Sequence, residues 1–225
     1  MCGRFSLSTP AEILAGLFQA DVGALGELAP RYNIAPGTWV VTVRPAGPAG
    51  GREAALARWG LVPAWAKDSE IGSRMINARG ETVAEKPAFR AAFRQRRCIV
   101  PADGFYEWRS EGGVKQPYHF RARDGRALGL AGLWERWRSA GGELLETCAI
   151  VTTEANEIVR PVHPRMPVVL SPSDYGAWLG AGGEGAPAPA TLLVPCPAEQ
   201  LVGYRVDRRV NSPRADDPAL AEPID

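Results

Sequence analysis

Apolar and polar residues alternate along much of the chain, and a period of about two residues is typical of β-strands. Several of these runs are rich in Val, Ile, Thr and aromatic residues, which favours strands further. We expect strands at 39–45, 54–65, 97–108, 116–122, 127–135 and 147–153. The run at 54–65 passes from a strand into a loop of prolines and aromatic residues.

Helical spacing of apolar residues is confined to short segments. We expect helices at 8–20, 84–97, 154–159 and 172–180. The chain has no visible internal repeat, no alternation of strand and helix, and no phosphate-binding glycine loop. These patterns predict a single α+β domain over residues 1–225, with a mainly antiparallel, twisted, barrel-like sheet and a few flanking helices.

The first predicted helix has recognisable start signals. Thr9 is expected to cap it, Pro10 suits the first helical position, and Glu12 completes a capping box. The expected buried stripe consists of Ile13, Leu14, Leu17 and Phe18. Near the other end of the chain, 180–190 is a low-complexity Gly, Ala and Pro segment that predicts a mobile loop. We expect little regular structure in 212–225.

The composition is that of an ordinary soluble globular protein, with 225 residues, 45% of them hydrophobic and 23% charged. The formal net charge of +1 excludes a strongly basic protein, although it leaves room for a basic face. No segment approaches the ~20 apolar residues of a membrane span, and the first residues do not form a secretory signal. We therefore expect a cytoplasmic protein with no membrane partner.

The cysteines and histidines give no support for a metal centre or a disulfide framework. The four cysteines, Cys2, Cys98, Cys148 and Cys196, form no C-x-x-C pair. Only two histidines, His119 and His163, are present. Cys98 and Cys148 lie in apolar strands and are expected to be inert core thiols. We expect chemistry without a metal or a cofactor.

Cys2 stands directly behind Met1. Initiator methionines are commonly removed when a small residue follows, and removal would leave Cys2 with a free α-amine beside its thiol. No internal residue offers this pair, because an internal backbone nitrogen is part of an amide. The alternative is that Cys2 is a packing residue.

Three short segments place polar residues where they are unusual. Asn77 and Arg79 follow an apolar pair in "MINARGET", where we expect a loop rather than a strand core. Glu107 lies between two aromatic residues in "ADGFYEWR", and His163 and Arg165 lie in the proline-rich turn of "VRPVHPRMPVVL". Taken singly, each has a simpler explanation. Asn77 would cap a following helix, Glu107 would face solvent on an alternating strand, and His163 would only bond its own turn.

Several motifs together resemble the SRAP family, the SOS-response-associated peptidases or abasic-site-processing proteins. The motifs are "MCGRF", "RYNIAPGT", "RWGLVPAWAKD", "MINARGET", "CIVPADGFYEW", "KQPY", "VTTEAN" and "VHPRMPVVL". They occur in the family order and extend over nearly the whole chain. One motif alone would be a weak signal, whereas the complete set in order is a strong one.

The resemblance implies a protein that crosslinks covalently to abasic sites in single-stranded DNA once Met1 has been removed. In this relationship Cys2 is the nucleophile, and its amine and thiol together form a thiazolidine ring with the sugar aldehyde. Asn77 orients Cys2, Glu107 transfers protons, and His163 contacts the sugar. Reversal of the crosslink and self-removal of Met1 are further expectations.

The resemblance also implies a DNA-binding surface. Arg4, Arg79 and Arg165 match positions near the DNA phosphates, and Trp65 matches a loop that separates the bases of the strand. Ala66 stands where some relatives have a second tryptophan, which puts the strength of that separation in question. We expect a monomer that associates with the nucleoid when it is bound to DNA.

Two other functions remain open from the sequence. The first is a cysteine peptidase or amidohydrolase in which His163 activates Cys2. The second is a module that binds single-stranded nucleic acid without a covalent bond. Cleavage of external peptides would favour the first, and DNA binding that survives a Cys2→Ser substitution unchanged would favour the second.

Overall fold

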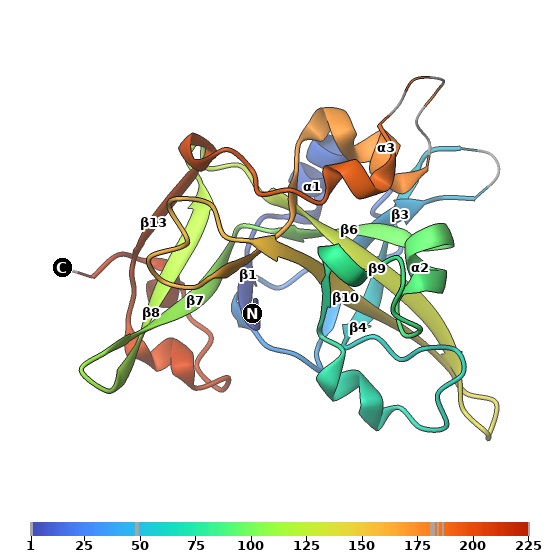
Figure 1. Cartoon of the computed structure of the whole chain (residues 1–225), viewed down its shortest axis with the longest axis horizontal. Coiled ribbons are helices and arrows are strands. Elements are labelled where there is room, and N and C mark those ends of the chain that lie inside the picture. The colour runs from blue at the N-terminus through green and yellow to red at the C-terminus, as the bar shows by residue number, and fades with distance from the viewer. Residues whose placement is uncertain (1, 48–49, 181–182, 184, 186, 225) are drawn as a thin grey trace.

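The computed structural model describes residues 2–47, 50–180, 183, 185 and 187–224 (Figure 1). A five-stranded sheet has the spatial order β13 (Leu201–Arg205), β8 (Val114–Ala122), β7 (Gly104–Glu111), β1 (Phe5–Leu7) and β2 (Arg31–Ile34). All of its neighbours are antiparallel. The first strand of the chain therefore lies inside this sheet, paired on both sides.

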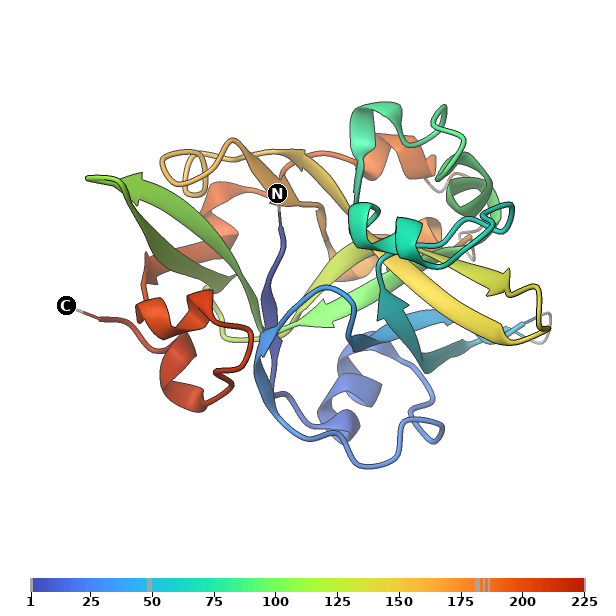
Figure 2. The ribbon, with the colours of Figure 1, turned by 90° about the horizontal axis from the view of Figure 1, so that it is seen from below.

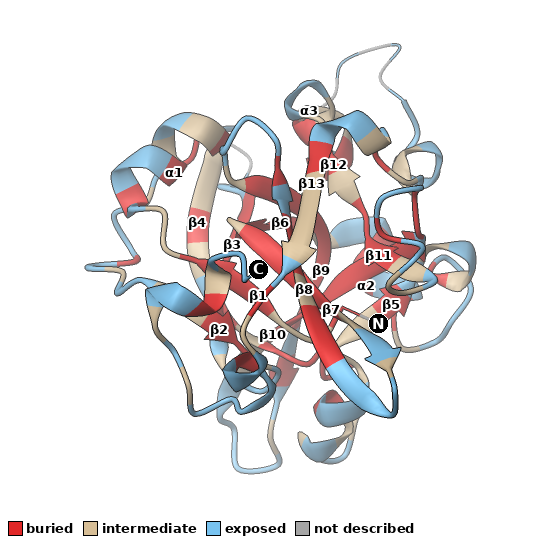
Figure 3. Ribbon diagram, turned by 90° about the vertical axis from the view of Figure 1, so that its left-hand side faces the viewer, coloured by how far each residue is buried: buried red, intermediate tan, exposed pale blue. Residues whose placement is uncertain are grey.

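The second sheet closes into a barrel. Its ring consists of β10 (Leu144–Glu154), β4 (Arg52–Trp59), β3 (Trp39–Pro45), β6 (Arg97–Ala102) and β9 (Leu128–Arg138), and β9 pairs with β10 again. Three short strands extend the ring: β5 (Asn77–Arg79) and β11 (Arg165–Pro167) pair with β10, and β12 (Val169–Leu170) pairs with β9. Buried residues run through the barrel strands, coloured red in Figure 3.

Helices are few and short in the described part of the chain. The α-helices are α1 (Ala11–Phe18), α2 (Arg90–Gln95) and α3 (Tyr175–Leu179). The 3₁₀ turns lie at Glu70–Arg74, Gly80–Thr82, Pro172–Asp174, Pro189–Leu192, Ala198–Gln200, Arg208–Asn211 and Pro218–Ala221. The fold is α+β with a barrel-like core, as the alternation of apolar residues predicted.

The predicted strand 97–108 is two strands that belong to different sheets. β6 ends at Ala102 and β7 begins at Gly104, with Asp103 between them. The Asp103 carboxylate accepts hydrogen bonds from the backbone and hydroxyls of Ser8 and Thr9, which ties this junction to the chain after β1. A polar residue in mid-strand was the available signal for the change of sheet.

Three helix predictions need correction. Residues 154–159 do not form a helix: Glu154 ends β10 and turns begin only at 157, because the Asn156 side chain accepts the Val159 N–H and competes with helical bonding. The segment 84–97 is helical only over Arg90–Gln95, since residues 87–89 form a turn that starts at Pro87 and Arg97 begins β6. Thr9 does not cap α1: its hydroxyl bonds Asp103, and Pro10 occupies the cap position without a side-chain bond. Ile13, expected in the buried stripe, is 55% exposed.

The backbone after β4 packs very closely against the 3₁₀ turn that precedes β5. A Cβ on Gly60 would lie 2.7 Å from the Gly72 carbonyl oxygen, and one on Gly72 would lie 2.6 Å from the Gly60 oxygen. Gly60 also has a φ of +133°, which side chains rarely adopt. Trp59 donates its indole N–H to the Ile76 carbonyl at 2.9 Å. These contacts fix the position of β5, which carries Asn77.

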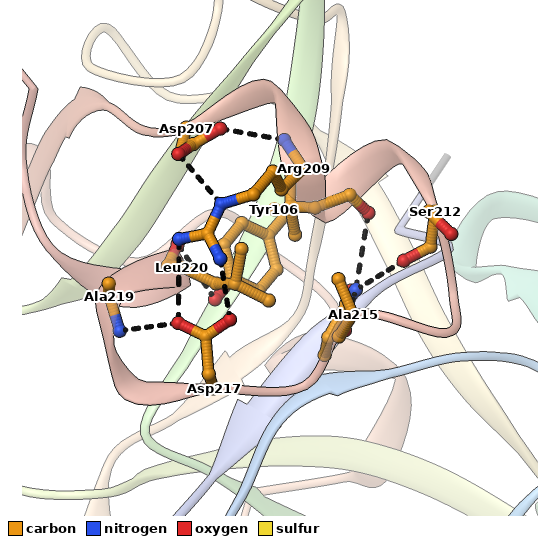
Figure 4. Close-up of polar contacts among 10 residues, drawn as sticks. Tyr106, Asp207, Arg209, Ser212, Ala215, Asp217, Ala219 and Leu220 are labelled. Atoms are coloured by element: carbon orange, nitrogen blue, oxygen red, sulfur yellow. Dashed lines mark hydrogen bonds and ion pairs between the residues drawn. The ribbon is translucent and has the colours of Figure 1, made fainter.

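The C-terminal segment, residues 206–224, packs beside β7 and β8 (red in Figures 1 and 2). Apart from its two 3₁₀ turns it is irregular, close to the expectation for 212–225. Val206, Val210 and Leu220 bury the Tyr106 ring. Arg209 holds the segment together through Asp207 and Asp217, as Figure 4 shows.

Three other sequence expectations concern the loop at 180–190, a membrane span and the core cysteines. The mobile-loop prediction for 180–190 falls partly on residues outside those described (181–182, 184 and 186) and stays a prediction. Among the described residues, no helix combines the length and apolar character that crossing a membrane requires. Cys98 and Cys148 are fully buried, as expected of core thiols.

Candidate active site

β1 places Cys2 beside Glu107. β1 and β7 are antiparallel with Phe5 opposite Phe105, and the Tyr106 N–H donates to the Arg4 carbonyl at 2.9 Å. Continued by two residues, this register sets Gly3 opposite Glu107, with Cys2 one residue further along. Cys2 is fully buried, at 0% exposure. The sheet, and not a loose terminus, therefore determines where Cys2 lies.

Asn77 holds the Cys2 backbone. Its side-chain Nδ2 donates a hydrogen bond of 2.8 Å to the Cys2 carbonyl oxygen. Asn77 begins β5, which pairs in parallel with β10, so the expectation of a loop here and the capping alternative are both wrong. The Asn77 Oδ1 atom is buried and has no hydrogen-bond partner among the described residues. A buried acceptor of this kind is available for a donor on Cys2 or on a ligand.

Glu107 is a buried carboxyl group. It is 2% exposed, so the alternative of a solvent-facing strand residue is wrong. Burial raises the pKa of Glu107 to about 7, because the charged form loses its hydration. At neutral pH such a group is present both as an acid and as a base. This is the protonation behaviour that proton transfer in both directions requires.

His163 faces Glu107 from the turn between β10 and β11. Its Nδ1 lies 3.8 Å from Glu107 Oε2. The backbone N–H of Arg165 donates to the same Nδ1 at 3.0 Å, which fixes the ring against its turn. Burial lowers the pKa of His163, so the imidazole is neutral at physiological pH. The turn contact expected of a purely structural histidine is present, together with the approach to Glu107.

The Cys2 thiol is protonated in this environment. Burial raises the pKa of the thiol well above its usual value, and the nearby Glu107 charge raises it further. The effect of the Glu107 charge is consistent with the position of Cys2 next to the residue opposite Glu107. Cys2, Asn77, Glu107 and His163, which lie far apart in the sequence, therefore form one site. The site therefore combines a neutral thiol (Cys2), a carboxyl that can transfer protons (Glu107) and a neutral imidazole (His163). This combination suits addition to a carbonyl group better than it suits nucleophilic attack by a thiolate.

Arg79 and Arg165 flank the same residue of β10. Thr152 pairs with Arg79 of β5, and the Arg165 guanidinium donates to the Thr152 carbonyl at 2.7 Å and contacts its hydroxyl at 3.3 Å. Arg165 also makes a two-point ion pair with Glu81. Arg79 is exposed, and the Arg165 side chain is 20% exposed. The structure therefore brings two of the predicted phosphate-binding residues to one place, beside His163.

Arg4 and Trp65 do not join this group. The Arg4 guanidinium donates to Asn33 Oδ1 at 2.6 Å and to the Val210 carbonyl at 2.8 Å, so this nitrogen faces the C-terminal segment. Trp65 is 61% exposed, as expected for a residue in the loop after β4. Its role in separating bases stays a prediction.

Sequence reasoning missed three residues around the site. Glu81 pairs with Arg165, Thr152 contacts Arg165, and Asn33 holds Arg4. All three lie in motifs that the resemblance used, namely "MINARGET", "VTTEAN" and "RYNIAPGT". Their place in these motifs was the only indication in the sequence that they lie near the site. None of the three is a polar residue in an unexpected apolar or proline-rich segment.

Within the described ranges, no group of three His, Cys, Asp or Glu side chains is placed to hold a metal ion. The residues of the site also do not form a helix N-terminus or glycine loop for a nucleotide cofactor.

Comparisons with known proteins identify relatives that match most of this chain. Curated relatives include the abasic site processing protein YoqW of Bacillus subtilis, 39% identical over 99% of both chains. YedK of Escherichia coli, with the same description, is 32% identical over 100% of both chains. HMCES of Gallus gallus is 34% identical and matches 75% of this chain but 56% of its own length.

The fold is also known from experiment. A solved structure of a protein from Bacteroides thetaiotaomicron has a TM-score of 0.88 at 28% identity, covering 99% of this chain and 100% of that one. A protein from Bordetella bronchiseptica gives 0.76 at 33% identity. The family described as SOS response associated peptidase matches residues 1–213. This chain belongs to the SOS response associated peptidase (SRAP) family.

Proposed function

We propose that this protein processes abasic sites in single-stranded DNA by forming a covalent bond through Cys2. The observation that carries the proposal is the convergence of Cys2, Asn77 and Glu107 at the start of β1, with His163 beside Glu107. Relatives that match the chain over nearly its full length are described as abasic site processing proteins, which supports the choice of substrate.

The first step opens the sugar. An abasic deoxyribose is a cyclic hemiacetal in exchange with an open aldehyde, and opening requires a proton at the ring oxygen and loss of one from the hydroxyl. Glu107, with a pKa of about 7, transfers both protons in turn. His163, held as a neutral imidazole near Glu107, hydrogen-bonds the sugar hydroxyl and assists this transfer.

The second step joins the protein to the aldehyde. Once Met1 has been removed, the Cys2 α-amine attacks the aldehyde carbon, and loss of one water gives an imine. The Cys2 thiol then adds across the C=N bond, its sulfur bonding to carbon and its proton moving to nitrogen. The product is a five-membered thiazolidine, and no other reactant is needed. Because thiol and amine belong to one residue, effective molarities of ~10⁵ M or more favour ring closure.

Asn77 and the protonated thiol fit this order of events. Asn77 holds the Cys2 carbonyl, which fixes the direction of the neighbouring amine and thiol. A buried thiol of raised pKa is a poor free nucleophile, so the amine reacts first and the thiol traps the imine. The same thiol argues against a peptidase that attacks external peptide bonds with a thiolate.

DNA recognition in this proposal is mainly to the backbone, because a missing base offers no edge to read. Arg79 and Arg165 contact phosphates beside the lesion, and Trp65 stacks on a neighbouring base, worth ~1–3 kcal/mol. Single strands fit the proposal because a base next to the lesion has to leave its stack to meet an exposed tryptophan. Binding should therefore depend strongly on salt and weakly on sequence.

The test is a denaturing gel and intact mass measurement with an abasic single-stranded oligonucleotide. Protein lacking Met1 should form a denaturant-resistant adduct of one protein and one DNA strand, minus one water. Cys2→Ala keeps the α-amine and removes the thiol, so it should give only a reversible imine that borohydride traps. Cys98→Ala, a buried thiol outside the site, is the matched control and should crosslink normally. An undiminished heat-stable adduct with Cys2→Ala would exclude the thiazolidine.

A further inference from the structure

A carboxylate pairs with Arg165, one of the two arginines that the proposed function assigns to DNA phosphates. Glu81 Oε2 accepts a hydrogen bond of 3.0 Å from Arg165 Nη2, and its other oxygen accepts from Nη1. The pairing with Arg165 lowers the pKa of Glu81, and the charge of Arg79 also contributes to the lowering. Glu81 is therefore ionised at neutral pH and lies close to both cations.

The donors around this carboxylate form a site suited to a phosphodiester. Arg165 presents a planar pair of donors, the geometry that binds carboxylate and phosphate oxygens equally well. Its position is fixed from behind by the Thr152 carbonyl, which accepts from Nη2 at 2.7 Å. Arg79 adds a second charge from β5, on the other side of β10, and makes no ion pair within the described part of the chain. These donors form an anion-binding site, and the anion that they bind in this structure is the Glu81 carboxylate.

Glu81 does not contribute to the core. It lies in the short 3₁₀ turn Gly80–Thr82, and its side chain is 54% exposed. Exposed ion pairs contribute little to folding, typically up to ~1 kcal/mol. The Arg165 side chain, by contrast, is 20% exposed and stays in place through its Thr152 contacts. Glu81 can therefore move away while the arginine remains.

We propose that Glu81 is an internal competitor for the DNA phosphate at the Arg79–Arg165 site and that it limits binding to undamaged single strands. This inference rests on the proposed function, because it assumes that the partner is single-stranded DNA. A phosphate has to displace the carboxylate before it reaches Arg165. On an intact strand the protein then dissociates readily. On an abasic strand the covalent bond retains the protein. A weaker initial contact with the phosphate therefore has little effect on how much protein stays bound.

The test compares Glu81→Gln with a matched control, Glu85→Gln. Glu85 is exposed, lies four residues further along the same connection, and loses the same unit of charge when substituted. Binding of full-length protein to a fluorescent oligothymidylate without lesions is measured by anisotropy at low salt. We expect Glu81→Gln to bind about fivefold more tightly, the effect of one unit charge at about 4 Å in water. Glu85→Gln should change affinity by less than about twofold because its charge is further away and screened.

A second comparison repeats the measurement in a protein that lacks Arg165. When Arg165→Gln is the starting protein, Glu81→Gln should give no more gain than Glu85→Gln. The proposal is overturned if Glu81→Gln binds equally to the control or more weakly than wild type, because Glu81 would then only position Arg165. It is also overturned if the gain persists without Arg165, or if no variant binds the oligonucleotide.

These outcomes are separate from those of the crosslinking proposal. The oligothymidylate has no aldehyde, so its binding is independent of the Cys2 chemistry. If abasic strands are never crosslinked while the Glu81→Gln gain is present, the competitor stands and the crosslinking proposal fails. If crosslinking occurs and the gain is absent, the competitor alone fails.

Discussion

Asn33 connects the segment around Cys2 and Arg4 to the C-terminal segment, and Asn33→Ala removes that connection. The side chain is 3% exposed. Its Oδ1 accepts from Arg4 at 2.6 Å, and its Nδ2 donates to the carbonyls of Ala215 at 2.6 Å and Ser212 at 2.9 Å. A longer contact of 3.3 Å reaches Val210. The substitution leaves a half-buried guanidinium and several carbonyls without these partners.

The magnitude follows from these bonds. The bond from the charged Arg4 is worth about 2 kcal/mol, and the two short neutral bonds about 1 kcal/mol each. We therefore expect Asn33→Ala to lower the free energy of unfolding by about 4 kcal/mol, a large fraction of the stability of an ordinary domain. Because Arg4 follows Cys2 by two residues, crosslinking should also slow.

Urea unfolding followed by tryptophan fluorescence measures this loss. The matched control is Asn211→Ala, which removes an exposed amide that accepts one bond of 2.6 Å from the Trp108 indole. The control should lose about 1 kcal/mol or less, because an exposed partner is replaced by water. Equal m-values in the variants would show that the difference is one of stability.

The reasoning is refuted if Asn33→Ala loses no more than the Asn211→Ala control. In that case the bonds of Asn33 would be replaced by water at no net cost. A second contradiction would be a large loss of stability with an unchanged crosslinking rate at temperatures where the variant stays folded. The C-terminal segment would then stabilise the fold without positioning Cys2.

Three further predictions concern the site and its support. Glu107→Gln should abolish the inflection of the crosslinking rate near pH 7 and slow the reaction at every pH. Because the folded pKa of Glu107 is raised from 4.5 to about 7, the wild type should lose up to about 3 kcal/mol of stability as pH rises through that interval, and urea unfolding of Glu107→Gln should lack this slope. Asn77→Ala should slow crosslinking by tenfold or more (~1.4 kcal/mol) in single-turnover assays; Asn77→Asp, which also lacks the donor to Cys2, should not restore the rate. Gly60→Ala should destabilise the fold by about 2–4 kcal/mol, since it combines an unfavourable φ with a backbone clash. Gly37→Ala, at a φ of +84° with nothing within 4 Å, should cost only about 1 kcal/mol, and equal losses for the two would contradict the close approach of Gly60 to Gly72.

Local patterns predicted most of the strands because β-branched and apolar alternation is a local property. β3, β8, β9 and β10 lie where the alternation predicted them, with some differences at their ends. The closure of the barrel could not be predicted in the same way, because β10 pairs with segments from four different parts of the chain. Such pairing depends on non-local contacts that no window of residues contains.

The burial of Glu107 is the clearest case where the local pattern was misleading. Alternation along β7 places Phe105 and Glu107 on one face and Tyr106 on the other. A strand with one solvated face would expose the glutamate. Here Tyr106 packs under the C-terminal segment and Phe105 lies in the main core, so both faces are covered. The resemblance singled out Glu107 as a proton-transferring residue, which stays a prediction, whereas its buried environment could only be read from the complete fold.

The site residues themselves could be named from motifs, but their contacts could not. Arg4 shows the difference: it was expected at the DNA phosphates, and its Nη1 bonds Asn33 and the C-terminal segment. Its contact with DNA stays a prediction. Glu81 and Thr152 belong to recognised motifs, but nothing in the sequence indicated that the Arg165 guanidinium donates hydrogen bonds to both of them.

The pairing of β1 on both sides has a consequence for how the chain tolerates insertions. Phe5 is fixed between β2 and β7, and the Asn77 amide holds the Cys2 carbonyl, so the chain between these two points has to span a set distance. Each extra residue of extended chain between Cys2 and Phe5 would move Cys2 by roughly 3.3 Å, past the reach of the Asn77 amide. The number of residues between Cys2 and Phe5 is thus itself a structural constraint, and a protein that kept every side chain but altered this count would lose the contact between Asn77 and Cys2.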